Sequence, residues 1–512
     1  MRIIHLEEAL HQHFNYDFFR QGQKEIISDV LRGEDVLGVL PTGSGKSICY
    51  QLPAKLLDGI TLVVSPLISL MVDQVKELKA ASFKEVIALN SFLPFQKQQR
   101  ILKNLDTYRL IYVSPEWLQK SAHLNYLKQL PVKLFVVDEA HCISQWGHEF
   151  RPDYQRLHEA IAALNHPRVL ALSATATPDV QRDIIQSLHK PDMKKHIYPM
   201  DRKNIAFCVE EAENDQEKLE RITEIIASYA VPTLIYFTSR QAAEEVALSL
   251  AAKHPERNIA YYHGGMEAAE RLRVQQQFMS NHINIICCTS AFGMGINKPD
   301  IRLVIHYHLP LQIESYIQEV GRAGRDGKSS VGMILYQKGD FRLSANMVKN
   351  ELPAIENIDH LVSTIVALQR QHMDLPSPEQ LHMLLDINEG AARFIQRQLQ
   401  KHGLLRDNEW LIDEEKWKQV RVSVMNYLEK RQLYKNKKLN ELYQWIQTKN
   451  CLRKTLYHPF QNGFEKPSDQ CCSNCGFDWS KWMPSSSFKT AEASYPVNWR
   501  KKLQRILHLE EV

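Results

Sequence analysis

Short apolar runs alternate with amphipathic stretches along the first 200 residues, and this alternation predicts strands separated by helices. The amphipathic stretches include 66–80 and 178–189. Apolar runs of this length, separated by helices of about 10–15 residues, are typical of βαβ units in a parallel sheet. The predicted strands of this first half are 36–40, 60–65, 110–114, 134–137 and 169–173.

The same alternation returns between about 230 and 340, so the chain is predicted to contain two doubly wound lobes. We expect the lobes to join near 200–210, and from about 345 the sequence becomes helical and richer in Lys and Gln. A proline-marked linker at 373–378 interrupts this third part. The predicted strands of the second half are 233–237, 259–262, 283–288, 303–307 and 331–336.

The bulk composition narrows the class of protein without identifying it. At about 150 residues per domain, 512 residues suggest about three domains. A hydrophobic content of 44% allows each domain to bury a core. The net charge of +4 is too small to indicate nucleic-acid binding by itself. Any such affinity must therefore come from local basic patches.

The N-terminus and the cysteines indicate a reducing, cytoplasmic environment. Glu7 and Glu8 lie near the start and no apolar h-region follows, so we expect no signal peptide. No run of about 18 apolar residues predicts a membrane span. Five of the nine cysteines are scattered and four cluster near the end, which does not suggest a disulfide framework.

A glycine-rich loop follows the first predicted strand and predicts a phosphate-binding site. Its glycines allow backbone N–H groups to wrap a phosphate, Lys46 would reach the β- and γ-phosphates, and the Ser47 hydroxyl would coordinate Mg²⁺. Leu40 stands where the generic pattern has Gly. A simple glycine-rich turn is the alternative. The candidate nucleotide ligands of this loop are Thr42, Gly43, Ser44, Gly45, Lys46 and Ser47.

The segment 138–154, DEAHCISQWGHEFRPDY, joins two kinds of chemistry. Asp138 would hold Mg²⁺ through water and Glu139 would orient the attacking water. A helix N-cap acid pair is the alternative for these two carboxylates. Flat side chains mixed with cations follow, and such groups stack on bases and track phosphates. The candidate DNA contacts are Trp146, His148, Phe150, Arg151 and Tyr154.

Two further segments belong to the candidate ATP site. The small hydroxyl residues of 173–176 end a strand and would transmit strain from the nucleotide, unless they form a simple turn. Arg322 and Arg325 lie three apart, so on a helix they would share a face and approach the γ-phosphate as arginine fingers. A solvated helix end is the alternative for the two arginines.

Near the N-terminus, an aromatic segment carries a candidate base-binding site. The Gln23 amide could pair with adenine N6 and N7, and Tyr16 could stack on the ring. Arg20 lies between them and belongs to the same candidate site. An aromatic-rich core helix is the alternative.

In chain order, these segments resemble the RecQ family of ATP-dependent DNA helicases over about residues 5–340. The matching elements are FNYDFFRQGQKEI, LPTGSGKS, VVSPLISLMVDQ, DEAHCISQWGHEFRPDY, LSATAT, YFTSR, YYHGGM, TSAFGMGINKPDIRLVIHYHLP and QEVGRAGRDG. The aromatic loop after DEAH distinguishes this family from RNA helicases. Asn297 and His308 stand where many members have Asp, and neither belongs to the phosphate site argued above.

The resemblance implies a superfamily 2 motor that moves 3′→5′ on single-stranded DNA and unwinds duplexes, with ATP and Mg²⁺ as cofactors. It implies single-stranded and duplex DNA as partners, together with a single-stranded-DNA-binding protein or other repair proteins. It also implies a nucleoid-associated monomer of the short form that lacks the HRDC domain. The alternatives are an RNA helicase or RNA–DNA remodeller, and a DNA-binding scaffold with a vestigial motor.

The resemblance also divides the chain. The expected fold is α/β, with two tandem RecA-like lobes and a mostly helical C-terminal region that bears a zinc-binding element. The expected parts are 1–205 as the ATP-binding lobe, 206–345 as the second lobe, 346–415 as a helical DNA-binding insert, 416–480 as a helical hairpin with the zinc element, and 481–512 as a linker with a short amphipathic helix.

Cysteines near the end resemble the family's zinc ligands. They are Cys451, Cys472 and Cys475, and the spacing of the last two lets two thiolates meet one Zn²⁺. The family places a fourth Cys where this chain has Asp478, so either Asp478 or Cys471 would complete the site. Reduced thiols without a metal are the alternative to this structural Zn²⁺.

Two further segments suggest DNA contact. Helix, turn, basic helix and hairpin over 377–412 resemble a winged helix, with an ordinary helical spacer as the alternative. Lys and Arg interleaved with aromatic residues over 421–454 suggest a duplex-backbone footprint, unless they form a solvated helix face. An apolar stripe over 499–507 is expected to dock on the protein itself.

Overall fold

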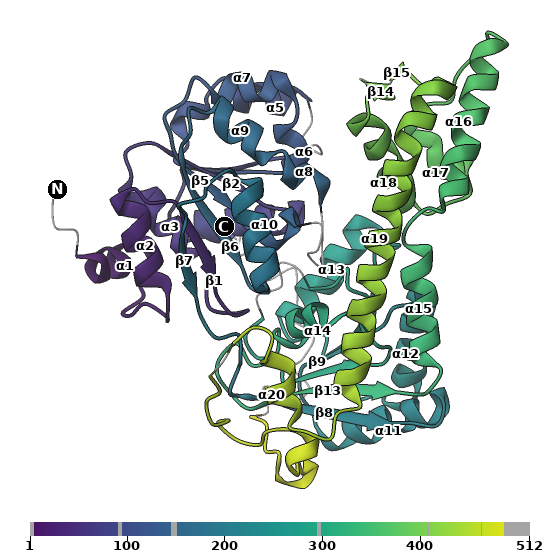
Figure 1. The fold of residues 1–512 in the computed structure, drawn as a ribbon. Helices are drawn as coiled ribbons and strands as arrows, with labels where there is room; N and C mark the ends of the chain where they lie inside the picture. The colour runs from purple at the N-terminus through teal and green to yellow at the C-terminus, as the bar shows by residue number, and fades with distance from the viewer. Residues whose placement is uncertain are drawn as a thin grey trace, which may run out of the picture.

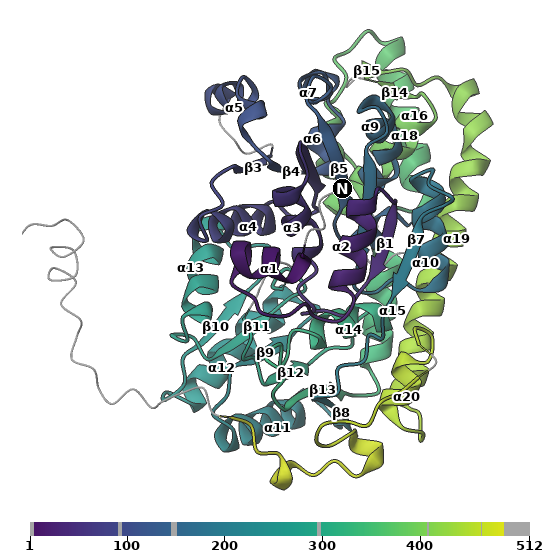
Figure 2. The same cartoon turned by 90° about the vertical axis from the view of Figure 1, so that its left-hand side faces the viewer.

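The computed structural model describes residues 5–90, 95–144, 151–293, 298–406, 409–461 and 463–485. Two lobes lie one above the other, and one long helix runs beside both (Figure 1). The side view keeps the lobes stacked and shows the last described segment along the bottom of the second lobe (Figure 2). No helix of the described residues is long and apolar enough to cross a membrane. Asn297 and the 499–507 stripe lie outside the described residues.

The first lobe is built on a seven-stranded parallel sheet with strand order β3-β4-β2-β5-β6-β1-β7. All five predicted strands are present, and the sequence patterns missed β3 and β7 at the two edges. The polar sequence Lys194-Lys195-His196 explains the omission of β7. The strands are β1 (Val36–Val39), β2 (Ile60–Val64), β3 (Val86–Leu89), β4 (Leu110–Val113), β5 (Val132–Val137), β6 (Arg168–Ser173) and β7 (Lys194–Ile197).

Helices cover both faces of this sheet because successive strand residues point to opposite faces. Leu37 and Val39 enter one buried cluster, whereas Val36 enters the other. The helices are α1 (Leu6–Phe14), α2 (Gln23–Arg32), α3 (Ile48–Leu56), α4 (Ile68–Ala80), α5 (Phe95–Leu102), α6 (Pro115–Leu118), α7 (Ser121–Leu127), α8 (Pro152–Gln155), α9 (Leu157–Ala163) and α10 (Pro178–Ser187).

The second lobe repeats the architecture with six parallel strands in the order β10-β11-β9-β12-β13-β8. The five predicted strands are confirmed, and β8 lies where we expected the junction between lobes. The strands are β8 (Ile205–Glu211), β9 (Thr233–Tyr236), β10 (Ile259–Tyr262), β11 (Ile285–Cys288), β12 (Leu303–His306) and β13 (Ser330–Tyr336). The helices are α11 (Asp215–Ser228), α12 (Arg240–Lys253), α13 (Ala268–Met279) and α14 (Ile313–Val320).

The C-terminal region is mostly helical, and its part between residues 358 and 428 forms a module around its own core. The expected helices and hairpin over 377–412 are present, and Ile395 and Leu399 are buried there beside Trp417 of α19. The elements are α15 (Asp340–Asn350), α16 (Ile355–Arg370), η3 (Pro378–Gln380), α17 (Leu381–Leu384), α18 (Glu389–Lys401), β14 (Leu405–Arg406), β15 (Glu409–Trp410), α19 (Glu414–Ile446) and α20 (Leu452–Tyr457). The core of the module therefore extends from α16 into the first half of α19.

Candidate functional site

The glycine-rich loop connects β1 to α3 at the carboxyl edge of the first sheet. Gly43 and Gly45 have φ values of 78° and 74°, a left-handed conformation that favours glycine. The Ser44 hydroxyl is buried and has no hydrogen-bond partner among the described residues. A buried polar atom without a partner is costly, so this loop suits a polar ligand such as a phosphate.

Gln23 forms hydrogen bonds to the backbone of the phosphate loop. Its amide nitrogen donates to the carbonyl oxygens of Ser44 at 2.8 Å and Gly45 at 3.0 Å, and its amide oxygen accepts from the Arg20 backbone N–H. The Arg20 guanidinium donates to the Gly43 carbonyl at 2.5 Å. In this structure the Gln23 amide therefore supports the loop instead of facing a base. The Tyr16 ring is 54% exposed and leaves a face available for stacking.

Asp138 and Glu139 follow β5 at the same edge of the sheet. The Asp138 backbone N–H donates to the Val64 carbonyl, and the Glu139 N–H donates to the Asp138 carboxylate at 3.0 Å. Glu139 has a φ of 47°, which is uncommon for a residue with a side chain and frequent at functional sites. Burial and the Glu139 charge raise the pKa of Asp138 to about 7, whereas Lys46 opposes this shift. The buried Asp138 carboxylate is therefore suited to binding a cation.

His141 links the DEAH segment to the end of β6. Its Nδ1 atom lies 3.1 Å from the Ser173 hydroxyl and 3.5 Å from a Glu139 carboxylate oxygen. The Ser173 hydroxyl also accepts from the Thr175 backbone N–H at 3.3 Å. The segment 173–176 is therefore connected to the acid pair through a fully buried imidazole. The sequence patterns had not singled out this histidine.

The end of the aromatic segment is anchored on the acid pair. The Tyr154 hydroxyl donates to the Asp138 carbonyl at 3.2 Å, and the Tyr154 side chain is fully buried. The expected DNA contact is therefore corrected for Tyr154, because a buried ring presents no face to a base. The Arg151 side chain is about one-third exposed and lies 3.9 Å from Glu116. The other candidate contacts, which lie outside the described residues, are Trp146, His148 and Phe150.

Arg322 and Arg325 reach the seam between the lobes from the second lobe. They lie in turns after α14, which ends at Val320, and not on a helix as expected. The Arg322 side chain is 5% exposed and donates to the Gly293 carbonyl. A Cβ added at Gly43 would lie 3.0 Å from Cγ of Arg325, so this side chain packs against the phosphate loop.

The arginines form a site that favours an anion. Burial, together with the charges of Arg322 and Arg202, lowers the pKa of Arg325 to about 9. Like charges in a partly dehydrated seam repel one another, and an anion placed between them relieves the repulsion. The Lys46 ammonium belongs to the phosphate loop opposite. The geometry thus suits a nucleotide phosphate bound between the two lobes.

Four cysteines form a candidate metal centre below the second lobe. The sulfur atoms of Cys451, Cys471, Cys472 and Cys475 all lie within 4.8 Å of one another. The Sγ atom of Cys451 is 3.6 Å from that of Cys471 and 4.0 Å from that of Cys472. Tetrahedral Zn²⁺ with thiolates at about 2.3 Å needs sulfur atoms about 3.8 Å apart. These four thiols therefore fit a structural Zn²⁺.

The fourth position of this centre belongs to Cys471 and not to Asp478. The Asp478 carboxylate accepts from the Ser480 backbone N–H at 3.0 Å and pairs with Lys481 at 3.3 Å, so it caps a short helical turn. Cys471 and Cys472 are neighbours in the chain, and the sulfur atoms of both belong to the cluster.

Metal analysis of purified variants tests this assignment. Cys471→Ser is expected to lower bound zinc from about one ion per chain to well below half, because one of four thiolates is lost. Asp478→Ala is the matched control and should retain zinc, since its carboxylate only caps a turn. The opposite pattern, with zinc lost only from Asp478→Ala, would show that the carboxylate is the ligand.

Comparison with known proteins agrees with this geometry. Residues 20–184 match the family model described as DEAD/DEAH box helicase, and residues 217–327 match the helicase conserved C-terminal domain. The fold is similar to that of Mycobacterium smegmatis helicase Lhr bound to ssDNA and AMP-PNP, with a TM-score of 0.55, 20% identity, and coverage of 78% of this chain and 57% of that one. It is also similar to S. cerevisiae Dbp5 bound to RNA and ADP BeF3, with a TM-score of 0.54, 17% identity, and coverage of 67% and 90%.

Closer similarity appears among curated sequences. The chain is 38% identical to the probable ATP-dependent DNA helicase RecS of Bacillus subtilis over 99% of both proteins. It is 43% identical to the ATP-dependent DNA helicase RecQ of Haemophilus influenzae, in a match that spans 64% of this chain and only 52% of that protein. The chain therefore belongs to the RecQ family of ATP-dependent DNA helicases.

Proposed function

We propose that this enzyme couples Mg-ATP hydrolysis to 3′→5′ translocation on single-stranded DNA and to duplex unwinding during DNA repair, recombination or replication-fork maintenance. The observation that carries the proposal is the packing of Arg325 of the second lobe against the phosphate loop of the first. A nucleotide between the lobes would contact cations from both. Its hydrolysis would change the forces that hold the lobes together, which is what translocation requires.

The acid pair and the phosphate loop have different roles in the proposed hydrolysis of ATP. Ser47 and Asp138 would hold Mg²⁺, whose charge would neutralise part of the phosphate charge when the ion is bound. Lys46 would hold the β- and γ-phosphates, and Glu139 would orient the attacking water. Arg322 and Arg325 of the second lobe would stabilise the charge that develops on the transferred phosphoryl group.

The path from DNA to the ATP site runs through 138–154. We propose that Trp146, His148, Phe150 and Arg151 contact the strand. The Tyr154 hydroxyl would carry the response to the acid pair, because it donates directly to the Asp138 carbonyl. The arrangement favours a sensor at this place over a passive surface loop.

Fewer cations of α19 are available to contact duplex DNA than the sequence suggested. Three cations of α19 are engaged within the protein, because Arg421 pairs with Asp359, Lys435 with Glu351, and Lys438 with Glu314. These three charges are therefore unsuited to phosphate contacts and do not belong to the footprint.

A groove of 630 Å³ between α18 and α19 remains basic. Lys401 and Lys430 line it, and the Lys401 ammonium lies 6.0 Å from the centre of the Tyr427 ring. Within the described part of the chain, neither lysine forms an ion pair. The Arg397 guanidinium donates to Asp153 at 2.5 Å, which joins the module to the first lobe within the segment 138–154. We propose that this groove holds the duplex backbone ahead of the motor.

Substitution Lys46→Ala tests the ATP site. DNA-stimulated ATP hydrolysis is expected to fall by at least on the order of 100-fold, because the transition-state charge loses a cation. DNA affinity should stay within about two-fold, since Lys46 lies in the nucleotide site. Phosphate release and fluorescence anisotropy measure the two properties, and the exposed Lys253→Ala is the control. Undiminished turnover in Lys46→Ala would contradict the assignment of this loop.

The wild-type protein in the same assays distinguishes DNA from RNA as the substrate. Stimulation by single-stranded DNA well above that by RNA, and strand displacement that requires a 3′ tail, are the expected results. Equal or greater stimulation by RNA would favour the RNA helicase or RNA–DNA remodeller that the sequence left open.

Substitution Tyr154→Phe tests the coupling path. The variant loses one hydrogen bond, worth about 1 kcal/mol, between the aromatic segment and Asp138. We expect basal ATP hydrolysis to persist and its stimulation by DNA to decrease several-fold. Tyr126→Phe on α7 is a control with an exposed ring. If DNA stimulates ATP hydrolysis by Tyr154→Phe as strongly as that by the wild type, this hydroxyl does not transmit the response.

Charge reversal of Lys401 and Lys430 to Glu tests the groove. Forked-duplex affinity should fall by about ten-fold, and the slope of log affinity against log salt should shrink by about 2. ATP hydrolysis stimulated by single-stranded DNA should stay within two-fold. Lys253→Glu combined with Lys84→Glu has the same charge change at exposed positions that do not line the groove, and it serves as the control. An equal loss of fork affinity in the control would contradict a specific groove.

A further inference from the structure

The linker between the lobes belongs to both sheets at its ends. The Tyr198 backbone N–H donates to the Val39 carbonyl of the first lobe at 3.0 Å. The Ser330 N–H donates to the Asn204 carbonyl at 2.9 Å, so the other end is attached to the second lobe. Asp201 and Arg202 lie between these attachments. Neither residue belongs to a sequence motif that predicted the ATP site.

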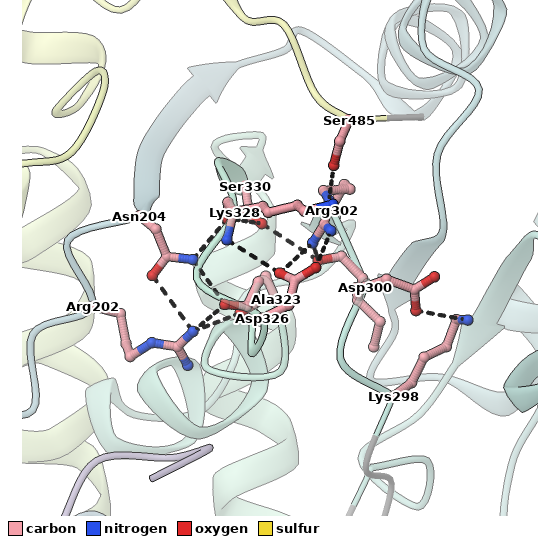
Figure 3. A network of polar contacts seen from close by, with 12 residues as sticks. Arg202, Asn204, Lys298, Asp300, Arg302, Ala323, Asp326, Lys328, Ser330 and Ser485 are labelled. Carbon is pink, nitrogen blue, oxygen red and sulfur yellow. Dashed lines mark hydrogen bonds and ion pairs between the residues drawn. The ribbon is translucent and has the colours of Figure 1, made fainter. Parts of the chain in front are cut away.

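The Arg202 guanidinium spans the seam between the lobes. One terminal nitrogen donates to the Thr42 carbonyl of the phosphate loop at 3.1 Å and to the Gly321 carbonyl at 3.4 Å. The other terminal nitrogen donates to the carbonyls of Ala323, at 3.3 Å, and Gly324. Figure 3 shows Arg202 and Asn204 reaching the turn that carries Ala323 from one side. The Arg202 side chain thus holds the backbone of the arginine turn, which carries Arg322 and Arg325, against the backbone of the phosphate loop.

The rest of the turn is fixed by neighbouring contacts. The Asn204 amide donates to the carbonyls of Gly324 at 2.8 Å and Lys328 at 2.7 Å. On the far side, Arg302 pairs with Asp326 and also donates to the Ser485 hydroxyl at 3.3 Å (Figure 3). The turn is therefore fixed to its own lobe, and Arg202 is one of the contacts that join it to the other lobe.

At the seam, the arginine turn and the phosphate loop are packed so closely that neither has much space to change position. The Thr42 hydroxyl donates to the same Gly321 carbonyl at 3.2 Å, and a Cβ added at Gly321 would overlap this hydroxyl. A Cβ added at Gly43 would lie 3.3 Å from a terminal nitrogen of Arg202. The flat guanidinium of Arg202 directs its two terminal nitrogens to different carbonyls. A lysine ammonium is a single point donor and lacks this forked geometry.

The zinc-bearing region holds the linker from outside. The Arg453 guanidinium of α20 is 2% exposed, pairs with Asp201 and donates to the Arg202 carbonyl at 3.2 Å. The Gln461 amide oxygen accepts from the backbone N–H groups of Met200 at 2.9 Å and Asp201 at 3.1 Å. The backbone on both sides of the Arg202 side chain is consequently held in place.

We propose that Arg202 is a positioning residue for ATP hydrolysis, which sets the turn carrying Arg322 and Arg325 at its working distance from the phosphate loop. This inference rests on the proposed role of the two arginines in hydrolysis. Arg202 acts through backbone carbonyls and not on the nucleotide. Its removal should slow hydrolysis more than it weakens nucleotide binding, because Lys46 and the phosphate loop remain.

Steady-state ATP hydrolysis by Arg202→Ala and Arg202→Lys provides the test. In both variants kcat should fall, on the order of 100-fold in Arg202→Ala, because a displacement of about 1 Å costs that much when geometry limits the rate. The KM for ATP should change less than about three-fold. Methylguanidinium added to Arg202→Ala should restore part of the lost rate. Arg182→Ala, which removes an exposed arginine of α10, is the matched control.

A double-mutant cycle with Arg325→Ala separates positioning from direct action. If Arg202 works by placing Arg325, the loss in the double variant should be close to that of Arg325→Ala alone. Additive losses, or a kcat in Arg202→Ala within two-fold of wild type, would overturn the inference. Those results would leave the DNA-stimulated hydrolysis of the wild-type protein intact. Absence of that hydrolysis would contradict the proposed function instead.

Discussion

Repulsion among cations at the seam between the lobes is the constraint on which the site depends. Arg202, Arg322 and Arg325 gather opposite Lys46, and the pKa of Arg325 falls to about 9 because its charge is buried beside like charges. Such an assembly is less stable alone than with an anion between its halves. In the proposed mechanism, nucleotide binding would thereby favour the packed lobes, and loss of phosphate would weaken that preference. The charges proposed to stabilise the transition state would also make the packing of the lobes depend on the nucleotide.

The sequence predicted most of the fold because buried parallel strands are continuous apolar runs. It missed β3 and β7 at the edges of the first sheet, since the edge strand β7 carries Lys and His instead of an apolar run. The phosphate loop, the acid pair and the arginine pair were predicted from short motifs whose spacing the chemistry requires. The helix expected under the arginines was wrong, because glycines in GRAGRDG end α14 at Val320.

Contacts between distant segments were beyond prediction. Nothing local to Arg202 or Arg453 indicates that they meet, because 251 residues separate them and the contact is made to a backbone carbonyl. Tyr154 is an opposite case. The aromatic residues near it in the sequence suggested stacking on DNA, whereas the fold buries its side chain. The basic face of α19 likewise lost three of its cations to acids of other helices. In each case tertiary partners, which composition does not reveal, decided the role of a charged or aromatic side chain.

The length of α19 has a mechanical consequence. A continuous helix of 33 residues is about 50 Å long, and its second half packs on α14 and α15 of the second lobe. A tilt of about 6° at that end would move the other end by about 5 Å, which exceeds the 3.4 Å that separates nucleotides along one strand. The Arg397–Asp153 ion pair would have to break during such a swing. A rigid helix held at its tip by this ion pair would therefore convert a small rotation of one lobe into a larger displacement of the module at the tip.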